Sequence, residues 1–146
     1  MTNAWNVSYD GQASITLTKG QSIAALGGRI ILSPIFLLSA FGKIANPSTY
    51  IGYIEAFGLP LPFVCLAAAI LLESVGGIAL IVGYQTRWTG ALLAVFSAAT
   101  AVLFHRDLAD SNQFLHFWKN LAMAGGLLQL YAFGAGVLSL DQHLRK

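Results

Sequence analysis

The chain has 146 residues, of which 56% are hydrophobic and only 10% are charged, and its formal net charge is +2. A soluble domain carries about 25% charged residues, so this composition indicates an integral membrane protein. The positive charge is too small and too scattered for a nucleic-acid-binding surface. The single cysteine, Cys65, excludes an intramolecular disulfide and a cysteine redox pair, and we expect it to pack as a small apolar residue.

Four stretches are long and apolar enough to cross a bilayer, which takes about 20 residues. In chain order they cover residues 22–44, 61–82, 88–104 and 114–138. The sequence therefore predicts an all-α membrane protein built as a four-transmembrane-helix bundle. Its membrane domain covers residues 21–146 and follows a polar segment over residues 1–20.

A short helix is expected between the first two spans. Residues 48–58 carry aromatic and branched side chains at mixed helical spacing and one acid, Glu55. This pattern predicts a helix that lies in the membrane interface. Pro60 and Pro62 follow it and mark the start of the second span.

The orientation follows from the distribution of basic residues. The first 20 residues lack the basic and cleavable apolar regions of a secretory signal, so the first span is expected to be an uncleaved insertion signal. An even number of spans places both termini on one side. That side holds Lys19, Arg87, Arg145 and Lys146, against Lys43 and Arg106 on the other side. By the positive-inside rule, both termini are predicted to be cytoplasmic.

Four charged residues fall inside the predicted spans: Lys43 lies at the end of the first span, and Arg29, Glu73 and Lys119 lie deeper. A charge at the centre of a bilayer helix costs about 2.5 to 3.5 kcal/mol, so such residues face the protein interior and usually have a use. Taking about 1.5 Å of rise per residue, Arg29 and Glu73 lie at similar depths and have opposite signs. We therefore expect a buried ion pair, which serves either a site or only the packing and register of the bundle.

A second polar cluster is expected where the fourth span begins, near the outer mouth. It gathers Lys43, His105, Asp110, His116, Lys119 and Asn120. His116, Lys119 and Asn120 share one helix face and predict a ligand site. Two other interpretations stay open: Lys119 can extend to the lipid headgroups, and Asp110 can cap the fourth helix.

No metal site is predicted. His105 and His116, with Asp107 or Asp110, have the composition of a two-histidine, one-carboxylate site. Their spacing alone is weak evidence, and ordinary interfacial polar residues explain it better. The sequence also lacks a flavin fingerprint and a haem-ligand pair.

Paired glycines indicate close helix packing. Gly76 and Gly77 lie in the second span, and Gly125 and Gly126 lie in the fourth. Small residues let membrane helices approach closely, which favours a tight bundle over a wide pore. The same faces suit a homo-oligomer equally well.

These features resemble the DoxX family of small bacterial inner-membrane proteins. The strongest likeness is the block FHRDLADSNQFLHFWKNLAMAGGLLQLY, joined by ALGGRIILSPIFLLSAFGKIANP in the first span and LLESVGGIALIVGYQTRWTG in the second. The likeness covers residues 23–146. The positions that match the family pattern are Arg29, Glu73, Lys119, Asn120, Gly125 and Gly126.

The resemblance implies a multi-pass protein of the bacterial inner membrane with a link to redox chemistry. The family is named for a subunit of a membrane thiosulfate:quinone oxidoreductase, and some members are linked to thiol redox homeostasis. Because this sequence carries no redox cofactor motif, electrons would come from a bound quinone, a substrate or a partner redox protein. A quinone-like ring would accept hydrogen bonds from His116, Lys119 and Asn120, with Glu73 as a proton relay.

Two further classes of function remain open. The first is a non-enzymatic binder or carrier of a small amphipathic molecule or lipid, which would use the same polar groups. The second is a purely structural role, in which the charges only hold the bundle together. A cavity lined by aromatic and small residues favours a binding function, and a sealed ion pair without a cavity favours the structural role.

Overall fold

The computed structural model describes residues 18–144, which form helices and connecting loops and contain no strand. The helices are α1 (Lys19–Ala45), α2 (Pro47–Ala56), α3 (Pro62–Val82), α4 (Thr86–Phe104), α5 (Ser111–Phe133) and α6 (Leu140–His143). Most of the predicted polar segment, residues 1–17, lies outside the described residues, as do Arg145 and Lys146.

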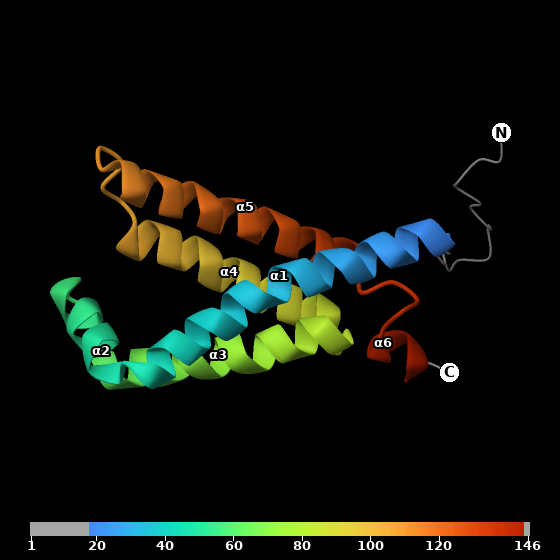
Figure 1. Cartoon of the computed structure of the whole chain (residues 1–146), viewed down its shortest axis with the longest axis horizontal. Helices are drawn as coiled ribbons and strands as arrows, with labels where there is room; N and C mark the ends of the chain where they lie inside the picture. Colours follow the sequence, from blue (N-terminus) through green and yellow to red (C-terminus); the bar gives the residue numbers. More distant parts are fainter. Residues whose placement is uncertain (1–17, 145–146) are drawn as a thin grey trace.

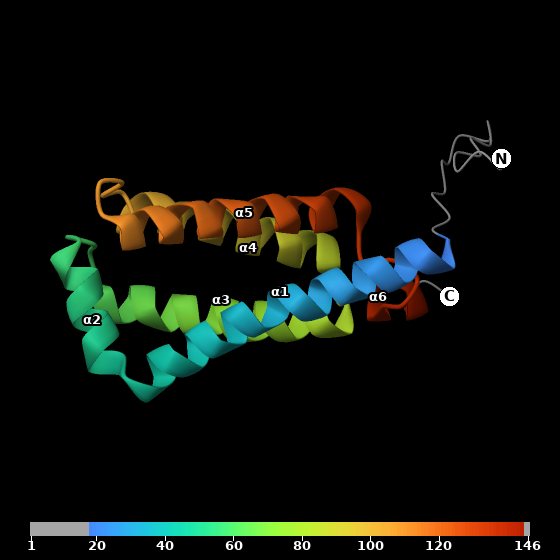
Figure 2. The same cartoon turned by 45° about the horizontal axis from the view of Figure 1, so that its top comes forward.

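The long helices form two layers (Figures 1 and 2). One layer pairs α1 with α3, and the other pairs α4 with α5. The helix α2 and the loop between α4 and α5 lie at one end, called here the α2 end. The helix α6 and the start of α1 lie at the opposite end, called here the α6 end. The layers meet through fully buried leucines, Leu80 of α3, Leu93 of α4 and Leu127 of α5.

Local sequence fixes where the helices begin and end. Thr18 accepts a hydrogen bond from the backbone N–H of Gln21, whose side chain accepts one from Thr18, so α1 starts with a capping box. The helix α3 starts at Pro62, where a missing N–H costs nothing. It ends at Gly83, whose φ of 70° suits a residue without a side chain.

Within residues 18–144, three helices, α1, α3 and α4, are long and apolar enough to cross a membrane. They match the first three predicted spans to within a few residues. The helix α5 has 23 residues and packs along α4, but polar residues such as Lys119 and Asn120 lower its mean hydropathy, and it is not among the three. It leaves the helical conformation at Gly134, short of the predicted end at residue 138.

The glycine pairs differ in their surroundings. A Cβ atom on Gly76 would come within 3.0 Å of Leu93, and one on Gly77 within 2.7 Å of Leu37. A Cβ on Gly125 would meet no atom of the described residues within 4 Å. Gly90 makes a close approach that the sequence analysis did not single out, because its Cβ would come within 2.9 Å of the Leu127 carbonyl oxygen. This contact brings α4 and α5 together.

Candidate functional site

A cavity of about 590 Å³ lies between the two helix layers toward the α2 end. Its lining comes from all five helices α1 to α5, together with Leu59 and His105. Most of the wall is apolar or aromatic, with Phe36, Tyr50, Tyr53 and Phe96 among the rings. The polar part of the wall consists of Ser39, Lys43, Glu73, Ser97, Thr100, His105, His116, Lys119 and Asn120.

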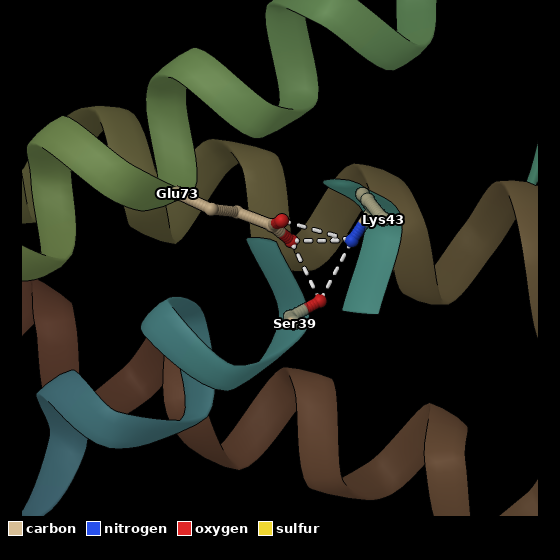
Figure 3. A network of polar contacts seen from close by, with 3 residues as sticks. All are labelled: Ser39, Lys43 and Glu73. Atoms are coloured by element: carbon tan, nitrogen blue, oxygen red, sulfur yellow. Dashed lines mark hydrogen bonds and ion pairs between the residues drawn. The ribbon is translucent and has the colours of Figure 1, made fainter. Parts of the chain in front are cut away.

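On the α1 and α3 layer, the polar lining is a network of three side chains (Figure 3). The Lys43 ammonium lies 2.8 and 3.0 Å from the two carboxylate oxygens of Glu73 and 2.7 Å from the Ser39 hydroxyl oxygen. Ser39 in turn lies 3.1 Å from Glu73 Oε1. Only 5% of the Glu73 side chain and 15% of the Lys43 side chain are exposed. The carboxylate therefore has its counter-charge inside the protein.

The predicted ion pair between Arg29 and Glu73 is wrong. Side chains on a helix lean toward its N-terminus. The helices α1 and α3 run in opposite directions, so Arg29 leans toward the α6 end and Glu73 leans toward the α2 end. Depth counted along the backbone ignores this divergence. Lys43 leans from the other end of α1 toward Glu73 and takes the place expected for Arg29.

Arg29 instead binds backbone carbonyls at the α6 end. Its Nη1 donates to the carbonyl oxygens of Leu80 (3.0 Å) and Ile81 (3.2 Å), and its Nη2 donates to that of Leu138 (2.5 Å). The last carbonyls of a helix lack intrahelical partners and carry partial negative charge, which suits a cation. The Arg29 side chain is fully buried, and its Nε has no partner among the described residues. It lies outside the cavity.

Asp141 of α6 completes this end of the molecule. Its carboxylate accepts hydrogen bonds from the backbone N–H groups of Gln85 (2.6 Å) and Thr86 (2.8 Å), where α4 begins. Its own N–H donates to the Gly83 carbonyl oxygen at 2.9 Å. A carboxylate at a helix N-terminus satisfies free donors and the helix dipole. The segment after α5 thus joins α1, α3 and α4.

On the α4 and α5 layer, the cavity lining is a row of neutral and cationic groups. The Lys119 ammonium lies 2.8 Å from Nδ1 of His116. The His116 ring stacks on His105 at a centroid distance of 5.0 Å, and His105 Nδ1 lies 2.8 Å from the Gln113 side-chain oxygen. Asn120 follows on the same helix and is 8% exposed. Four of the predicted site residues, Glu73, His116, Lys119 and Asn120, thus line one cavity.

Asp110 does not join them. Its carboxylate accepts a hydrogen bond from the backbone N–H of Gln113 at 2.8 Å. Asp110 therefore caps the N-terminus of α5, as one of the two interpretations of the sequence expected. Within residues 18–144, no three His, Cys, Asp or Glu side chains are placed to hold a metal ion.

The DoxX family model matches residues 24–106, more than half of the chain. The chain belongs to the DoxX family. Inner membrane protein YqjF of Escherichia coli K12 is 38% identical over 133 residues, which cover 89% of this chain and 98% of the relative. Inner membrane protein YphA of the same strain is 29% identical over 126 residues, which cover 82% of this chain and 89% of the relative.

These similarities establish a multi-pass inner-membrane protein of the DoxX family. No solved structure matches it. The matched part of this DoxX chain includes Arg29, Lys43 and Glu73, and it ends before α5.

Sequence reasoning missed several residues that shape the DoxX cavity. Ser39 bridges the ion pair, and the Tyr50 ring of α2 lies 5.4 Å from the Lys43 ammonium. Ser97 of α4 lines the cavity with a buried hydroxyl that has no partner among the described residues. Ser39 lies four residues before Lys43, and that spacing on one helix was a signal that the sequence contained.

Proposed function

We propose that this protein binds a small amphipathic molecule within the membrane. The observation that carries the proposal is the cavity of about 590 Å³, whose apolar wall is broken by a few convergent polar groups. Sites for small molecules usually measure about 300 to 1,000 Å³ and have this composition. A purely structural role for the charges would require no such space.

We further propose that α5 is a fourth span and that α2 lies in the interface. The helix α5 packs along α4, so a bilayer crossed by α4 also surrounds α5. Its polar face lines the cavity, and its opposite face exposes Leu115, Trp118 and Leu128. Apolar side chains of this kind suit contact with lipid, while the polar groups stay inside. Four spans place both termini on one side, and the basic residues favour the cytoplasmic side.

The test is native mass spectrometry of the protein purified in detergent. A small molecule should remain bound to the wild type. Ala69→Phe, which fills the cavity from α3, should lose it. Ala67→Phe is the matched control, because Ala67 lies on the same helix, is exposed and does not line the cavity. Equal retention by both variants would contradict binding in the cavity.

A quinone-linked redox role is the second candidate. The observation that favours it is that polar groups occupy both layers, Lys43 and Glu73 on one and Lys119 on the other. A flat ring between the layers would place its two carbonyl oxygens against these groups, with Glu73 as the proton relay. Electrons would then come from a substrate or a partner redox protein. Separately, the formation of a homo-oligomer stays a prediction from the sequence.

Solvent extraction of the purified protein separates the two candidates. A quinone-linked component yields a stoichiometric quinone with the characteristic ultraviolet absorbance change on borohydride reduction, and Ala69→Phe does not. A bound molecule without this absorbance change supports the non-enzymatic binder and contradicts the quinone role.

A further inference from the structure

The two lysines of the cavity have different electrostatic surroundings. Lys43 is neutralised by Glu73 through two contacts of 2.8 and 3.0 Å. Lys119 contacts the imidazole of His116, which supplies no negative charge when neutral. Among the described residues that line the cavity, Glu73 is the only acid. One positive charge of the cavity is therefore unmatched.

We infer that the molecule held in this cavity is a small amphipathic anion, an organic acid whose negatively charged head group lies against Lys119. The inference rests on the proposed binding function and names the chemical class of its ligand. The exposed Lys119 side chain lines the cavity, where the one acid of the lining, Glu73, already pairs with Lys43, and an anionic head group supplies the missing counter-charge. A neutral or cationic head group does not.

The neighbours of Lys119 also suit an anion, because they can donate hydrogen bonds. Asn120 is next in the chain, is buried and lines the cavity. The Ser97 hydroxyl on α4 is buried, lines the cavity and has no partner among residues 18–144. A carboxylate accepts hydrogen bonds from an ammonium, an amide N–H and a hydroxyl at once.

The packing of α4 against α5 brings these donors to one level. Gly90 of α4 lies against Leu127 of α5, and the two helices run in opposite directions. Moving two turns along each helix from this contact leads to Ser97 on α4 and to Asn120 on α5. The apolar remainder of the cavity, toward α1 and α2, is lined by Ile35, Phe36, Tyr53, Ile54 and Leu72 and receives the hydrophobic body of the acid.

The inference is tested with three probes that share one apolar body and differ in head-group charge. These are 1-naphthylacetate, 1-naphthylacetamide and 1-naphthylethylamine, which carry a negative, a neutral and a positive head group. Binding to the delipidated protein in detergent is measured by isothermal titration calorimetry. We expect the acid to bind at least about tenfold more tightly than the amide, as one charge-assisted hydrogen bond provides, and the amine to bind most weakly.

Two variants locate the effect. Lys119→Gln should remove the preference for the acid and leave binding of the amide within about twofold. Arg106→Gln is the matched control, since it removes one positive charge at the same end of the molecule from an exposed residue outside the cavity lining. It should keep the preference for the acid.

The possible failures are distinguishable. Equal affinity of the wild type for acid and amide, with both lost in Ala69→Phe, would overturn the inference about charge and leave the proposed binding function standing. A preference for the acid that survives Lys119→Gln would overturn the assignment to Lys119. Binding that is the same in wild type and Ala69→Phe for all three probes would overturn the binding function itself.

Discussion

The two ends of the bundle use buried cations in different ways. At the α6 end, the guanidinium of Arg29 binds backbone carbonyls from α3 and from the segment after α5, and it does not line the cavity. At the α2 end, Lys43 and Lys119 line open space, and only Lys43 has a carboxylate partner. A charge inside a membrane protein therefore indicates a ligand only where its surroundings leave both space and unmatched charge.

The largest loss of stability is expected at Arg29. It tests whether the buried cation at the α6 end stabilises the fold. Arg29→Lys keeps the charge, but one ammonium cannot replace two nitrogens that reach three carbonyls. Losing two charged hydrogen bonds should lower the free energy of unfolding by about 3 to 5 kcal/mol. Denaturation in detergent measures it, with Arg87→Lys, an exposed residue at the start of α4, as the control. Unchanged stability of Arg29→Lys would contradict the structural role.

At the α2 end, a double-mutant cycle tests the ion pair between Lys43 and Glu73. Glu73→Gln leaves Lys43 without its counter-charge and should cost about 2 kcal/mol. The double variant with Glu73→Gln and Lys43→Met should lose less free energy of unfolding than the sum of the losses in the two single variants, because both charges of the pair are then removed together. Arg29→Met with Glu73→Gln should instead be additive to within about 0.5 kcal/mol, since these residues share no partner. Strong coupling of Arg29 with Glu73 would restore the ion pair expected from the sequence.

A smaller effect is expected for the carboxylate that caps α4. Asp141→Ala removes the acceptor for the Gln85 and Thr86 N–H groups and should lower stability by about 1 kcal/mol. Gln142→Ala, an exposed neighbour in α6, should leave stability unchanged. Equal melting of the two variants would show that the cap contributes nothing.

Lys119 should affect the ligand and leave the fold intact. Lys119→Arg is expected to change the free energy of unfolding by less than about 0.5 kcal/mol, because the side chain is exposed at the cavity. A guanidinium differs from an ammonium in shape and in the directions of its donors, so the contact with His116 should change and the co-purifying molecule should be lost. Native mass spectrometry and circular dichroism measure the two quantities. A lysine that only extends to the headgroups would tolerate arginine, and retention of the molecule would then favour that role.

The last prediction assigns each end to a side of the membrane. In a Cys65→Ala background, Ser111→Cys at the start of α5 should react with an impermeant thiol reagent added to intact cells or spheroplasts. Gln142→Cys in α6 should react only after the membrane is opened, since the predicted orientation, with both termini cytoplasmic, places the α6 end inside. The reverse pattern would invert the topology.

Length and hydropathy were sufficient to predict most of the helical framework. The bounds of three predicted spans lie within a few residues of those of α1, α3 and α4, because each helix is a continuous apolar run bounded by Pro, Gly or polar residues. A helix was also predicted close to α2. The end of α5 was placed too late, since the apolar run continues past Gly134 although the chain turns there with a φ of 79°.

Less of the candidate site than of the fold could be predicted from the sequence. Helical spacing placed His116, Lys119 and Asn120 on one face, and this face lines the cavity. Counting depth along the backbone paired Arg29 with the wrong partner, because the direction in which each side chain leans depends on the direction of its helix. Hydrogen bonds from the backbone N–H groups of Gln85 and Thr86 to the Asp141 carboxylate join parts of the chain more than 50 residues apart, and no local pattern predicts such contacts.

The Arg29 contact with Leu138 also constrains how the protein is made. Leu138 follows Arg29 by 109 residues, so α1 enters the membrane long before its last hydrogen-bond partner has been synthesised. Because chains insert and fold from the N-terminus onward, the newly inserted α1 carries an unsatisfied guanidinium that water, lipid phosphates or the insertion machinery must solvate in the meantime. The α6 end of the bundle is therefore completed only after the segment that follows α5 has been made and has reached Arg29.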